Sequence, residues 1–350
     1  MSIERRLIML QKQNIDWDKL GFNASKTRSM WVGDCINGEI WSRGALEPYG
    51  NINISPAACV LNYAQGVFEG MKAYHTKKDR IVLFRPHMNA NRMAESTEKM
   101  CIPKMVPDYF INAVKATTLD NIDFVPPIEK GAMYLRPIVF GTTPSISVGP
   151  SIEYKFIVFA SPVGSYFPEG AKPLNMLISS NFHRAAPKGI GNAKAIGNYS
   201  ASLFPGKEAK SRGYNDMIYL RASNEGFVEE MGSANIFAVK NKKLITPRLG
   251  GSILPGITRN SVIRIAKDLL DLEVDEGDLS VDQILSADEV FCTGTAVVVN
   301  PIGSITKDDT KISLSNKGYG PITKKLRETL ISIQLEEIAD PFDWIYPVTD

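Results

Sequence analysis

The chain has few of the residues that build metal sites and disulfide frameworks. Its 350 residues include three histidines and four cysteines. No H-x-x-x-H or H-E-x-x-H spacing joins the histidines, which argues against the common helix-borne metal sites. The cysteines stand far apart and form no C-x-x-C pair, at Cys35, Cys59, Cys101 and Cys292. This spacing argues against structural zinc and predicts reduced thiols in a cytoplasmic protein without a bound metal.

Long apolar runs and blocks of one charge are also missing. No stretch approaches the ~20 apolar residues of a membrane span, and the apolar run at residues 7–10 is shorter than the core of a signal peptide. The 40 basic and 38 acidic residues are mixed along the chain and leave a net charge of +2, so no basic face for nucleic acid is indicated. The sequence therefore predicts a cytoplasmic protein that binds neither membrane nor nucleic acid.

The composition is that of an ordinary globular protein, with 44% hydrophobic and 22% charged residues. A chain of 350 residues is longer than one compact core usually allows, so two domains are expected. A stretch rich in proline and glycine at residues 161–173 marks the connection between them. We predict an α/β protein with a smaller N-terminal domain at 1–163, an interdomain loop at 164–173 and a strand-rich C-terminal domain at 174–350.

In the first half, local signals predict a hairpin and two helices. Residues 31–43 are typical of a hairpin with an Asn-Gly turn. A helix over 86–99 begins at a proline, which suits the first helical position. Apolar residues spaced three and four apart predict a second helix over about 108–119. The apolar run at 133–140 is typical of a strand, and Pro137 is expected to interrupt it.

The second half predicts several strands separated by helices at about 198–211, 258–271 and 321–337. Pro205 is expected to kink or break the first of these helices, because proline lacks the N–H that a helix interior requires. Thr258 is the expected N-cap of the second helix.

Residues 191–200, with the sequence Gly-Asn-Ala-Lys-Ala-Ile-Gly-Asn-Tyr-Ser, place a lone lysine among small and uncharged residues. A lysine that is buried in such surroundings loses part of its preference for the charged form and can act as an amine nucleophile toward a carbonyl compound. Lys194 is therefore a candidate catalytic nucleophile. Taken alone, a lysine in a loop rich in glycine and asparagine is far more often an ordinary solvated surface residue.

Two further segments have features of anion sites. Residues 254–259, Leu-Pro-Gly-Ile-Thr-Arg, open a helix whose free backbone N–H groups suit a phosphate, and the glycine allows close approach. Residues 291–297, Phe-Cys-Thr-Gly-Thr-Ala-Val, put hydroxyls and backbone N–H groups at a strand end. Both patterns also occur at ordinary helix ends and tight turns, so neither identifies a site by itself.

Charged residues also occur in apolar surroundings. Glu230 lies among small and apolar residues, where a carboxylate suits the pyridine nitrogen of pyridoxal phosphate (PLP). Glu229 has similar surroundings, but strand alternation puts the two on opposite faces. Arg92 in mid-helix and Arg136 on an apolar strand call for anionic partners. A solvated strand edge for the glutamates and structural salt bridges for the arginines are the open alternatives.

Together, and in this order, the motifs resemble the branched-chain amino acid aminotransferases, which are PLP enzymes of fold type IV. The resemblance covers about residues 30–345 and implies a two-domain fold, with a smaller α/β N-terminal domain and a strand-rich pseudo-barrel C-terminal domain. It rests on Y-x-x-x-V-F-E-G from Tyr63, H-M-x-x-x-R-M from His87, Y-x-R-P from Tyr134, S-P-V-G-x-Y from Ser161, H-R-A from His183, K-x-x-G-N-Y from Lys194, E-x-G-x-x-N-I-F from Glu230, L-P-G-I-T-R from Leu254 and G-T-A from Gly294.

The resemblance assigns the cofactor contacts residue by residue. It implies that Lys194 binds PLP covalently and moves a proton between the substrate and the cofactor. It implies that Tyr199 hydrogen-bonds the phenolic oxygen of PLP and that Glu230 pairs with the pyridine nitrogen. The implied phosphate contacts are Arg92, the backbone N–H groups of Ile257 and Thr258, and Thr295.

The same resemblance implies how substrate is bound. The substrate carboxylate would meet the turn at 295–297, which includes Ala296 and Val297. The implied side-chain pocket consists of aromatic and polar residues, namely Tyr63, Phe68, Tyr134, Arg136, Tyr166 and Ser233, with Arg136 helping to accept the distal carboxylate of glutamate. The family builds its site at a dimer interface, so Ile146 and Val148 would come from the partner subunit of a homodimer.

The implied reaction moves the amino group between L-leucine, L-isoleucine or L-valine and 2-oxoglutarate. Other fold type IV enzymes share the lysine and the glutamate: D-amino acid aminotransferase, (R)-amine transaminase and aminodeoxychorismate lyase. The Y-x-R motif at Tyr134 and the S-P-V-G-x-Y segment argue against them. A phosphate- or nucleotide-binding protein without catalysis is the alternative from a different class, and it would leave Lys194 and Glu230 without a role.

Overall fold

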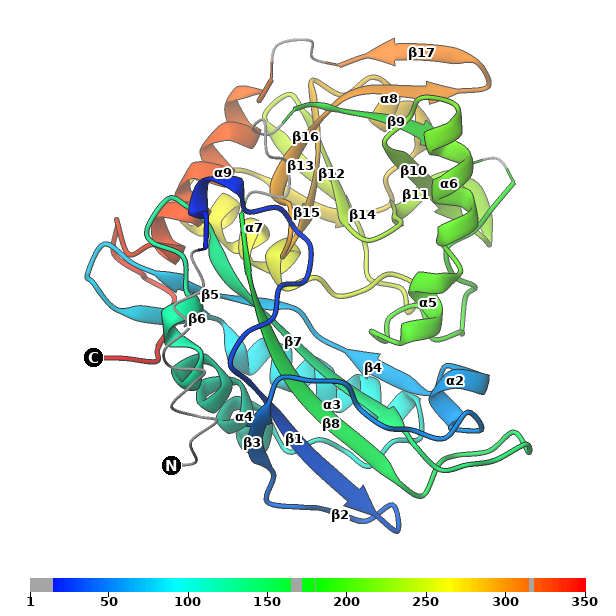
Figure 1. Cartoon of the computed structure of the whole chain (residues 1–350). Helices are drawn as coiled ribbons and strands as arrows, with labels where there is room; N and C mark the ends of the chain where they lie inside the picture. The colour runs from blue at the N-terminus through cyan, green and yellow to red at the C-terminus, as the bar shows by residue number, and fades with distance from the viewer. Residues whose placement is uncertain (1–14, 165–171, 180, 315–317) are drawn as a thin grey trace.

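The computed structural model describes residues 15–164, 172–179, 181–314 and 318–350. Within them the chain forms two curled β-sheets with helices packed around both (Figure 1). This mixed architecture agrees with the α/β class predicted from the sequence. None of the helices described is both long and apolar enough to cross a membrane.

The first sheet comes mainly from the N-terminal half of the chain. Its strands are β1 (Ser29–Ile36), β2 (Ile40–Trp41), β3 (Ala45–Pro48), β4 (Gly66–Phe68), β5 (Met71–His75), β6 (Ile81–Phe84), β7 (Ala132–Gly141), β8 (Tyr154–Val163) and β18 (Ile345–Pro347). They follow the order β18-β6-β5-β7-β8-β1-β2, with β3 beside β1 and β4 beside β7. The predicted hairpin is confirmed, since Cys35 pairs with Trp41 across a turn in which Asn37 and Gly38 have positive φ.

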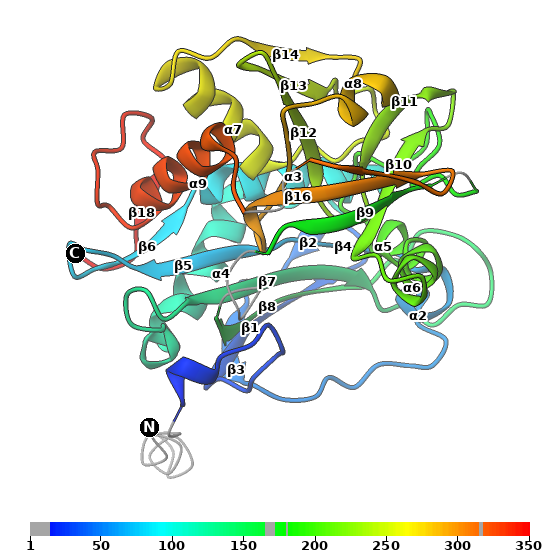
Figure 2. The same cartoon turned by 90° about the horizontal axis from the view of Figure 1, so that it is seen from above.

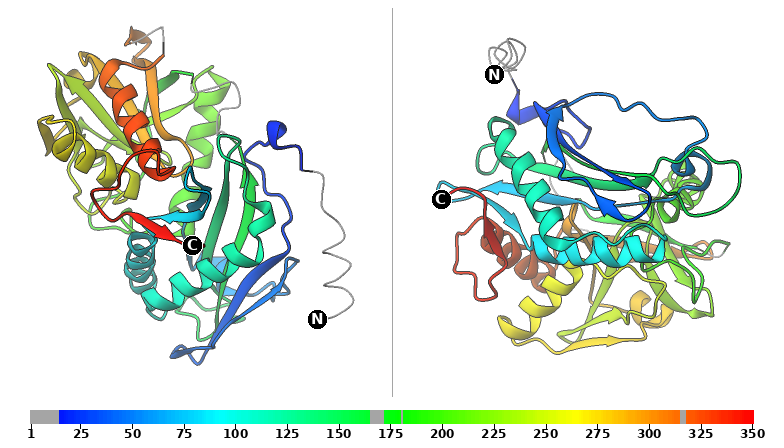
Figure 3. Two further views of the ribbon diagram at one scale, coloured as in Figure 1. Left: turned by 90° about the vertical axis from the view of Figure 1, so that its left-hand side faces the viewer. Right: turned by 90° about the horizontal axis from the view of Figure 1, so that it is seen from below.

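The helices α3 (Pro86–Lys99) and α4 (Pro107–Asp120) cover one face of the first sheet (Figure 3). Both helices start at a proline and agree closely with the predicted bounds. Their buried residues recur at helical spacing, as Phe110, Ile111 and Val114 illustrate. These side chains pack against β1, β5, β7 and β8 and form the core of this half.

The second sheet comes from the C-terminal half. Its strands are β9 (Leu174–Ile178), β10 (Asp216–Arg221), β11 (Asn224–Met231), β12 (Asn235–Lys240), β13 (Lys243–Pro247), β14 (Val274–Gly277), β15 (Glu289–Gly294), β16 (Val298–Lys307) and β17 (Thr310–Ser313). The order is β11-β10-β9-β16-β15-β12-β13-β14, with β17 beside β16. β9 runs parallel to both β10 and β16, and the sheet curls around its own apolar core (Figure 2).

The helices of the second half cover this sheet from outside. α7 (Ile257–Asp268) and α9 (Pro321–Gln334) pack together against β12, β15 and β16 and enclose a second apolar core. α6 (Leu203–Ser211) covers β10. The remaining described helical segments are short: η1 (Trp17–Lys19), α2 (Cys59–Tyr63), η2 (Ile122–Phe124), α5 (Ile196–Ser200) and α8 (Val281–Leu285).

Two prolines had been expected to disturb regular structure, and only one does. β7 runs through Pro137 without a break. The proline is tolerated because β7 changes neighbours there: residues 133–135 pair with β5 and residues 138–140 pair with β4. Its missing N–H therefore falls beside the gap between two partner strands. The predicted break near Pro205 is confirmed, since α5 ends at Ser200 and α6 starts at Leu203, which leaves Pro205 in a first turn where no N–H is needed.

The end of the chain returns to the first sheet. β18 pairs antiparallel with β6, through Tyr346 opposite Leu83, and Figure 3 shows this strand beside the first half. Residues 345–347 therefore belong to the first sheet, although the predicted range of the second domain, 174–350, includes them. The division at 164–173 otherwise stays a prediction.

Candidate active site

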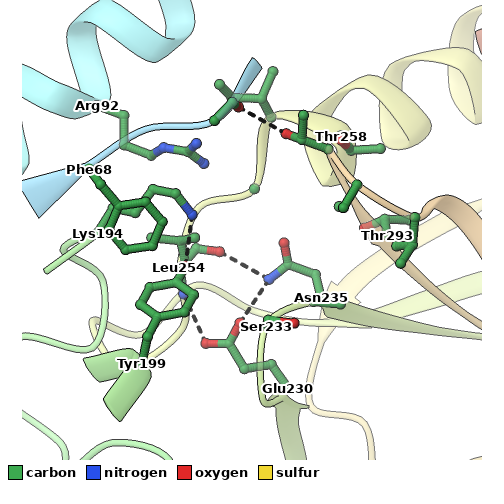
Figure 4. A pocket seen from close by; sticks show the side chains of 18 of the residues that line it. Phe68, Arg92, Lys194, Tyr199, Glu230, Ser233, Asn235, Leu254, Thr258 and Thr293 are labelled. Carbon is green, nitrogen blue, oxygen red and sulfur yellow. Dashed lines mark hydrogen bonds between the residues drawn. The ribbon is translucent and has the colours of Figure 1, made fainter. Parts of the chain in front are cut away.

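A cavity of about 550 Å³ lies where the two halves of the chain meet. Phe68 and Arg92 line it from the first half, and Lys194 and Glu230 line it from the second (Figure 4). Tyr134 of the first half lines it as well. These residues are far apart in the sequence, so only the packing of one sheet against the other brings them together.

Lys194 is held at this junction by contacts to the first half. Its backbone N–H donates to Oγ of Ser96 at 3.0 Å, and its carbonyl accepts from the N–H of Phe68 at 3.1 Å. Its Nζ donates to the hydroxyl of Tyr199 at 2.7 Å and lies 4.8 Å from the ring centre of Phe68. The side chain is half-buried and points into the cavity (Figure 4). The solvated-surface alternative for Lys194 is therefore wrong.

Glu230 is a buried carboxylate at the end of β11, with 2% of its surface exposed. Oε1 lies 3.1 Å from Nη1 of Arg184 and accepts the backbone N–H of Leu254, while Oε2 accepts from Nδ2 of Asn235 at 3.2 Å (Figure 4). Burial raises the pKa of Glu230 to about 7, and the charge of Arg184 and the N–H of Leu254 limit the rise. Near neutral pH the carboxyl group of Glu230 is therefore close to half-ionised, and a cationic N–H beside it would favour the charged form.

Glu229 is equally buried but does not line the cavity. Its Oε1 instead accepts the hydroxyl of Ser252. Strand alternation thus separates the two neighbours as expected, and the solvated-edge alternative is wrong because both side chains are only 2% exposed.

Arg92 is fixed by a fully buried acid. Nε and Nη2 donate to the two oxygens of Glu69 at 2.7 and 2.8 Å, and Nη1 donates to the carbonyl of Pro255 at 3.0 Å. Asn89 also donates to Glu69. Burial opposes the ionisation of Glu69, but the charge and hydrogen bonds of Arg92 outweigh it and hold the pKa of Glu69 below its usual range. The pair aims the guanidinium at the cavity beside the start of α7 (Figure 4).

The start of α7 faces the same part of the cavity. The helix begins at Ile257 with Gly256 as its N-cap, so Thr258 is inside the first turn and the predicted N-cap role of Thr258 is wrong. Glycine is required at 256 because a Cβ there would lie 2.0 Å from Oδ1 of Asn235. The first N–H groups of a helix have no intrahelical acceptor, so this end offers donors to an anion. Thr295 also lines the cavity, and its Oγ1 donates to the carbonyl of Gly70.

An aromatic and basic wall lies on the side of the first half. Nη2 of Arg136 donates to the hydroxyl of Tyr134 at 3.2 Å, and its guanidinium lies 4.8 Å from the ring centre of Phe68. Among the residues described, Nε of Arg136 is buried without a hydrogen-bond partner. Ser233, Ala296 and Val297 line the cavity as well. The arginine therefore keeps donor capacity for an anionic ligand group.

Three predicted site residues do not line this cavity. Tyr63 lies outside it, and its hydroxyl donates to the carbonyl of Ile146. The side chains of Ile146 and Val148 are 92% and 85% exposed. The three residues thus form one exposed group on the same chain. Tyr166 lies outside the described residues.

Sequence reasoning missed several residues that support the site. Glu69 and Asn235 stood inside recognised motifs, but nothing in the local pattern said that they would hold Arg92 and Glu230. Arg184 stood in the H-R-A motif, which was the only signal available for it. Phe22 and Thr293 also line the cavity. Within the described chain, no cluster of three or more His, Cys, Asp or Glu side chains is arranged to hold a metal ion.

Comparison with known proteins places this geometry in context. A family model described as amino-transferase class IV matches residues 66–305. The chain is 45% identical to branched-chain-amino-acid aminotransferase 5, chloroplastic, of Arabidopsis thaliana, over 94% of this chain and 79% of the relative. It is 37% identical to branched-chain-amino-acid aminotransferase 2 of Bacillus subtilis, over 98% and 96%. The PLP-form of the branched-chain amino acid aminotransferase of Thermobaculum terrenum superposes with a TM-score of 0.79 at 25% identity, over 93% of this chain and 99% of that one.

Proposed function

Because this chain belongs to the class IV aminotransferases, and within them to the branched-chain amino acid aminotransferases, we propose that the cavity performs their reaction. The enzyme moves the amino group between L-leucine, L-isoleucine or L-valine and 2-oxoglutarate, which yields branched-chain 2-oxo acids and L-glutamate. The observation that carries this function is the identity of 37–45% to these aminotransferases over nearly the whole chain.

The cofactor is PLP, and the cavity has a suitable group for each of its polar atoms. We assign Lys194 to the aldehyde carbon, Tyr199 to the phenolic oxygen and Glu230 to the pyridine nitrogen. We assign the phosphate to Arg92, to the first N–H groups of α7 at Ile257 and Thr258, and to Thr295. The buried Glu230 and the glycine-lined start of α7 are the features that fit this group and fit few others.

When bound, PLP supplies a carbonyl that takes up the amino group and a ring that withdraws electrons from the substrate Cα. The chain supplies the proton transfers. Nζ of Lys194 takes the proton from the substrate Cα in one half-reaction and returns a proton to Cα in the other. The hydroxyl of Tyr199 holds this amine at a distance of 2.7 Å. The carboxylate of Glu230 stabilises positive charge on the ring nitrogen. Its contacts to Arg184 and Asn235 fix its orientation.

The walls of the cavity account for substrate choice. We propose that the turn at 295–297, with Ala296 and Val297, binds the substrate carboxylate, and that Phe68, Tyr134 and Ser233 surround the aliphatic side chain. Burial of such a side chain contributes about 1.5–3 kcal/mol. One methylene is worth only ~1–3 kcal/mol, so discrimination among leucine, isoleucine and valine is weak. Arg136 lines the cavity, and its guanidinium binds the distal carboxylate of glutamate.

Visible absorption spectroscopy tests the proposed function. The purified protein with PLP is expected to absorb in the visible range through its lysine-bound cofactor, and L-leucine should abolish this band within one half-reaction. D-Alanine should leave the band unchanged. Loss of the band with D-alanine alone would assign the protein to the D-specific branch of the fold, and a protein that never acquires the band would refute the role of Lys194.

We further propose a homodimer in which the exposed group of Tyr63, Ile146 and Val148 completes the partner's side-chain pocket. Ile146 and Val148, which are 92% and 85% exposed, offer neighbouring apolar side chains that a partner subunit would cover. The hydrogen bond from Tyr63 to Ile146 ties the two segments into one surface. The site would then combine a lysine from one subunit with a loop from the other.

Subunit mixing tests this arrangement. Val148→Asp and Lys194→Ala are each expected to be inactive, the first because a charge enters the apolar pocket. Co-expression of both variants should restore about a quarter of the wild-type activity, since half of randomly formed dimers are mixed and one of their two sites is intact. No restoration above the single variants would mean that the loop acts within its own chain.

Two parts of the proposal rest on the sequence alone. A cytoplasmic location follows from the separated cysteines, although the Arabidopsis relative is named as chloroplastic. The division into domains at 164–173 follows from the proline and glycine content of that stretch.

A further inference from the structure

Lys72 is buried behind the turn at 295–297 and has no role in the reaction described above. It lies on β5 opposite Tyr134 of β7, and 8% of its surface is exposed. Its Nζ donates to the carbonyl of Ala296 at 3.3 Å. In the part of the chain that the structure describes, it forms no ion pair with a carboxylate. A buried ammonium group without an anion is costly, so this position requires a compensating interaction.

A second cation holds the same turn. Nη1 of Arg327, on α9, donates to the carbonyls of Val297 at 3.3 Å and Val299 at 2.9 Å. Between them, Val298 has a φ of 61°, a left-handed conformation that β-branched residues rarely adopt. The turn thus keeps an unfavourable backbone conformation while cations from β5 and α9 bind its carbonyls.

The planar peptide decides which groups of the turn face the substrate. In a trans peptide the C=O and the N–H point in opposite directions. Since the carbonyl of Ala296 points to Lys72, the N–H of Val297 points away from Lys72. Ala296 and Val297 line the cavity that contains Lys194, and they also line a separate cavity of about 220 Å³ together with Lys72 and Arg327. The turn therefore forms a wall between the two cavities.

We propose that Lys72 is a positioning residue for the substrate carboxylate. It holds the peptide between Ala296 and Val297 so that the N–H of Val297 faces the carboxylate, and it places a positive charge directly behind that N–H. The carboxylate then supplies a negative charge near Lys72, which has no carboxylate partner among the described residues. The proposal rests on the proposed function, because it takes the turn at 295–297 as the carboxylate contact.

The proposal makes carboxylate binding depend on pH. Burial, reinforced by the charge of Arg327, lowers the pKa of Lys72 to about 8. The positive charge is present below this value and is lost as the pH rises through it, so affinity falls in the same direction. The other groups around Lys72 are the guanidinium of Arg327 and the hydroxyl of Tyr74, and burial raises the pKa of Tyr74 so that it stays neutral. Glu129 and Lys130, which line the second cavity, are each paired with another charged residue.

The test compares a carboxylate with a neutral ligand of the same shape. The probes are 4-methylpentanoate, which is leucine without its amino group, and 4-methylpentanamide. Their dissociation constants are measured by calorimetry on the PLP-loaded protein at about pH 7 and about pH 9.5. Lys72→Met removes the charge at similar length. Lys130→Met is the matched control, because Lys130 lines the same cavity but pairs with Asp18.

At about pH 7, Lys72→Met is expected to bind the carboxylate about tenfold more weakly and the amide unchanged. Wild type should lose a similar factor between the two pH values, whereas Lys72→Met should not, and Lys130→Met should behave like wild type. Equal weakening of acid and amide, or the same pH dependence in Lys72→Met as in wild type, would overturn the proposal. If Lys72→Met does not fold, Lys72→Arg decides, because its permanent charge should remove the pH dependence.

The closing control separates this proposal from the proposed function. A wild-type protein whose visible band disappears with L-leucine, but whose Lys72→Met variant binds 4-methylpentanoate normally, refutes the role of Lys72 alone. A wild-type protein that does not respond to L-leucine refutes the proposed function, and the role of Lys72 with it.

Discussion

Replacing Lys194 by alanine is expected to lower turnover with L-leucine by about ten-thousand-fold or more. The substitution removes both the amine that binds PLP covalently and the base that moves the Cα proton. The fold should persist, because the backbone contacts of Lys194 to Ser96 and Phe68 do not involve its side chain. Single-turnover kinetics and circular dichroism measure the two effects.

The matched control is Lys188→Ala in the same loop. Lys188 is exposed and does not line the cavity, so the rate should stay within about twofold of wild type. A Lys194→Ala protein with a normal rate would end the assignment of this residue. A variant that is unfolded by circular dichroism would leave Tyr199→Phe as the deciding measurement, since loss of the hydroxyl bound to Nζ should shift the visible band of the cofactor.

Replacing Arg92 by leucine is expected to lower the free energy of unfolding by about 3–5 kcal/mol, because it leaves a buried charge uncompensated. Glu69 has no exposed surface, and Arg92 is the cation that pairs with it and donates to both of its oxygens. Chemical denaturation of the protein without PLP measures the loss. The double variant Arg92→Leu/Glu69→Leu should recover most of it, since the unpaired acid is gone as well.

The difference in unfolding free energy between wild type and Arg92→Leu should depend on pH with a definite sign. In wild type the pKa of Glu69 is lowered, so its contribution to stability is complete above the unfolded value of about 4.3 and is lost as the pH falls through the folded value. In Arg92→Leu burial acts on Glu69 without the guanidinium, so this variant should gain stability relative to wild type as the pH falls. An unchanged unfolding free energy in Arg92→Leu would show that the pair is not structural.

The double variant also separates stability from cofactor binding. Arg92 is assigned to the phosphate of PLP, so Arg92→Leu and the double variant should both bind PLP more weakly, although only the single variant is unstable. Equilibrium dialysis against PLP measures this difference. A double variant that binds PLP like wild type would remove Arg92 from the phosphate site.

The sequence by itself determined the elements that depend on near neighbours. Proline at a first helical position and apolar spacing of three and four predicted α3 and α4 to within a residue or two, and the Asn-Gly turn predicted the hairpin. Local signals failed where a tertiary neighbour mattered. Pro137 remains in a strand because its missing N–H falls opposite a gap, and residue 256 must be glycine because Asn235 leaves no room for a Cβ.

The residues of the site also fall into those that the sequence predicted and those that only the tertiary structure revealed. The order of short motifs was enough to predict Lys194, Tyr199 and Glu230 as cofactor contacts, and the structure places all three residues on one cavity. Which groups hold them was decided by tertiary structure alone. The pairing of Glu69 with Arg92 depends on how α3 packs beside β4. The contact of Lys72 with a turn more than two hundred residues away exists only because one sheet packs against the other. Contacts between distant segments depend on that packing, which no local pattern of residues encodes.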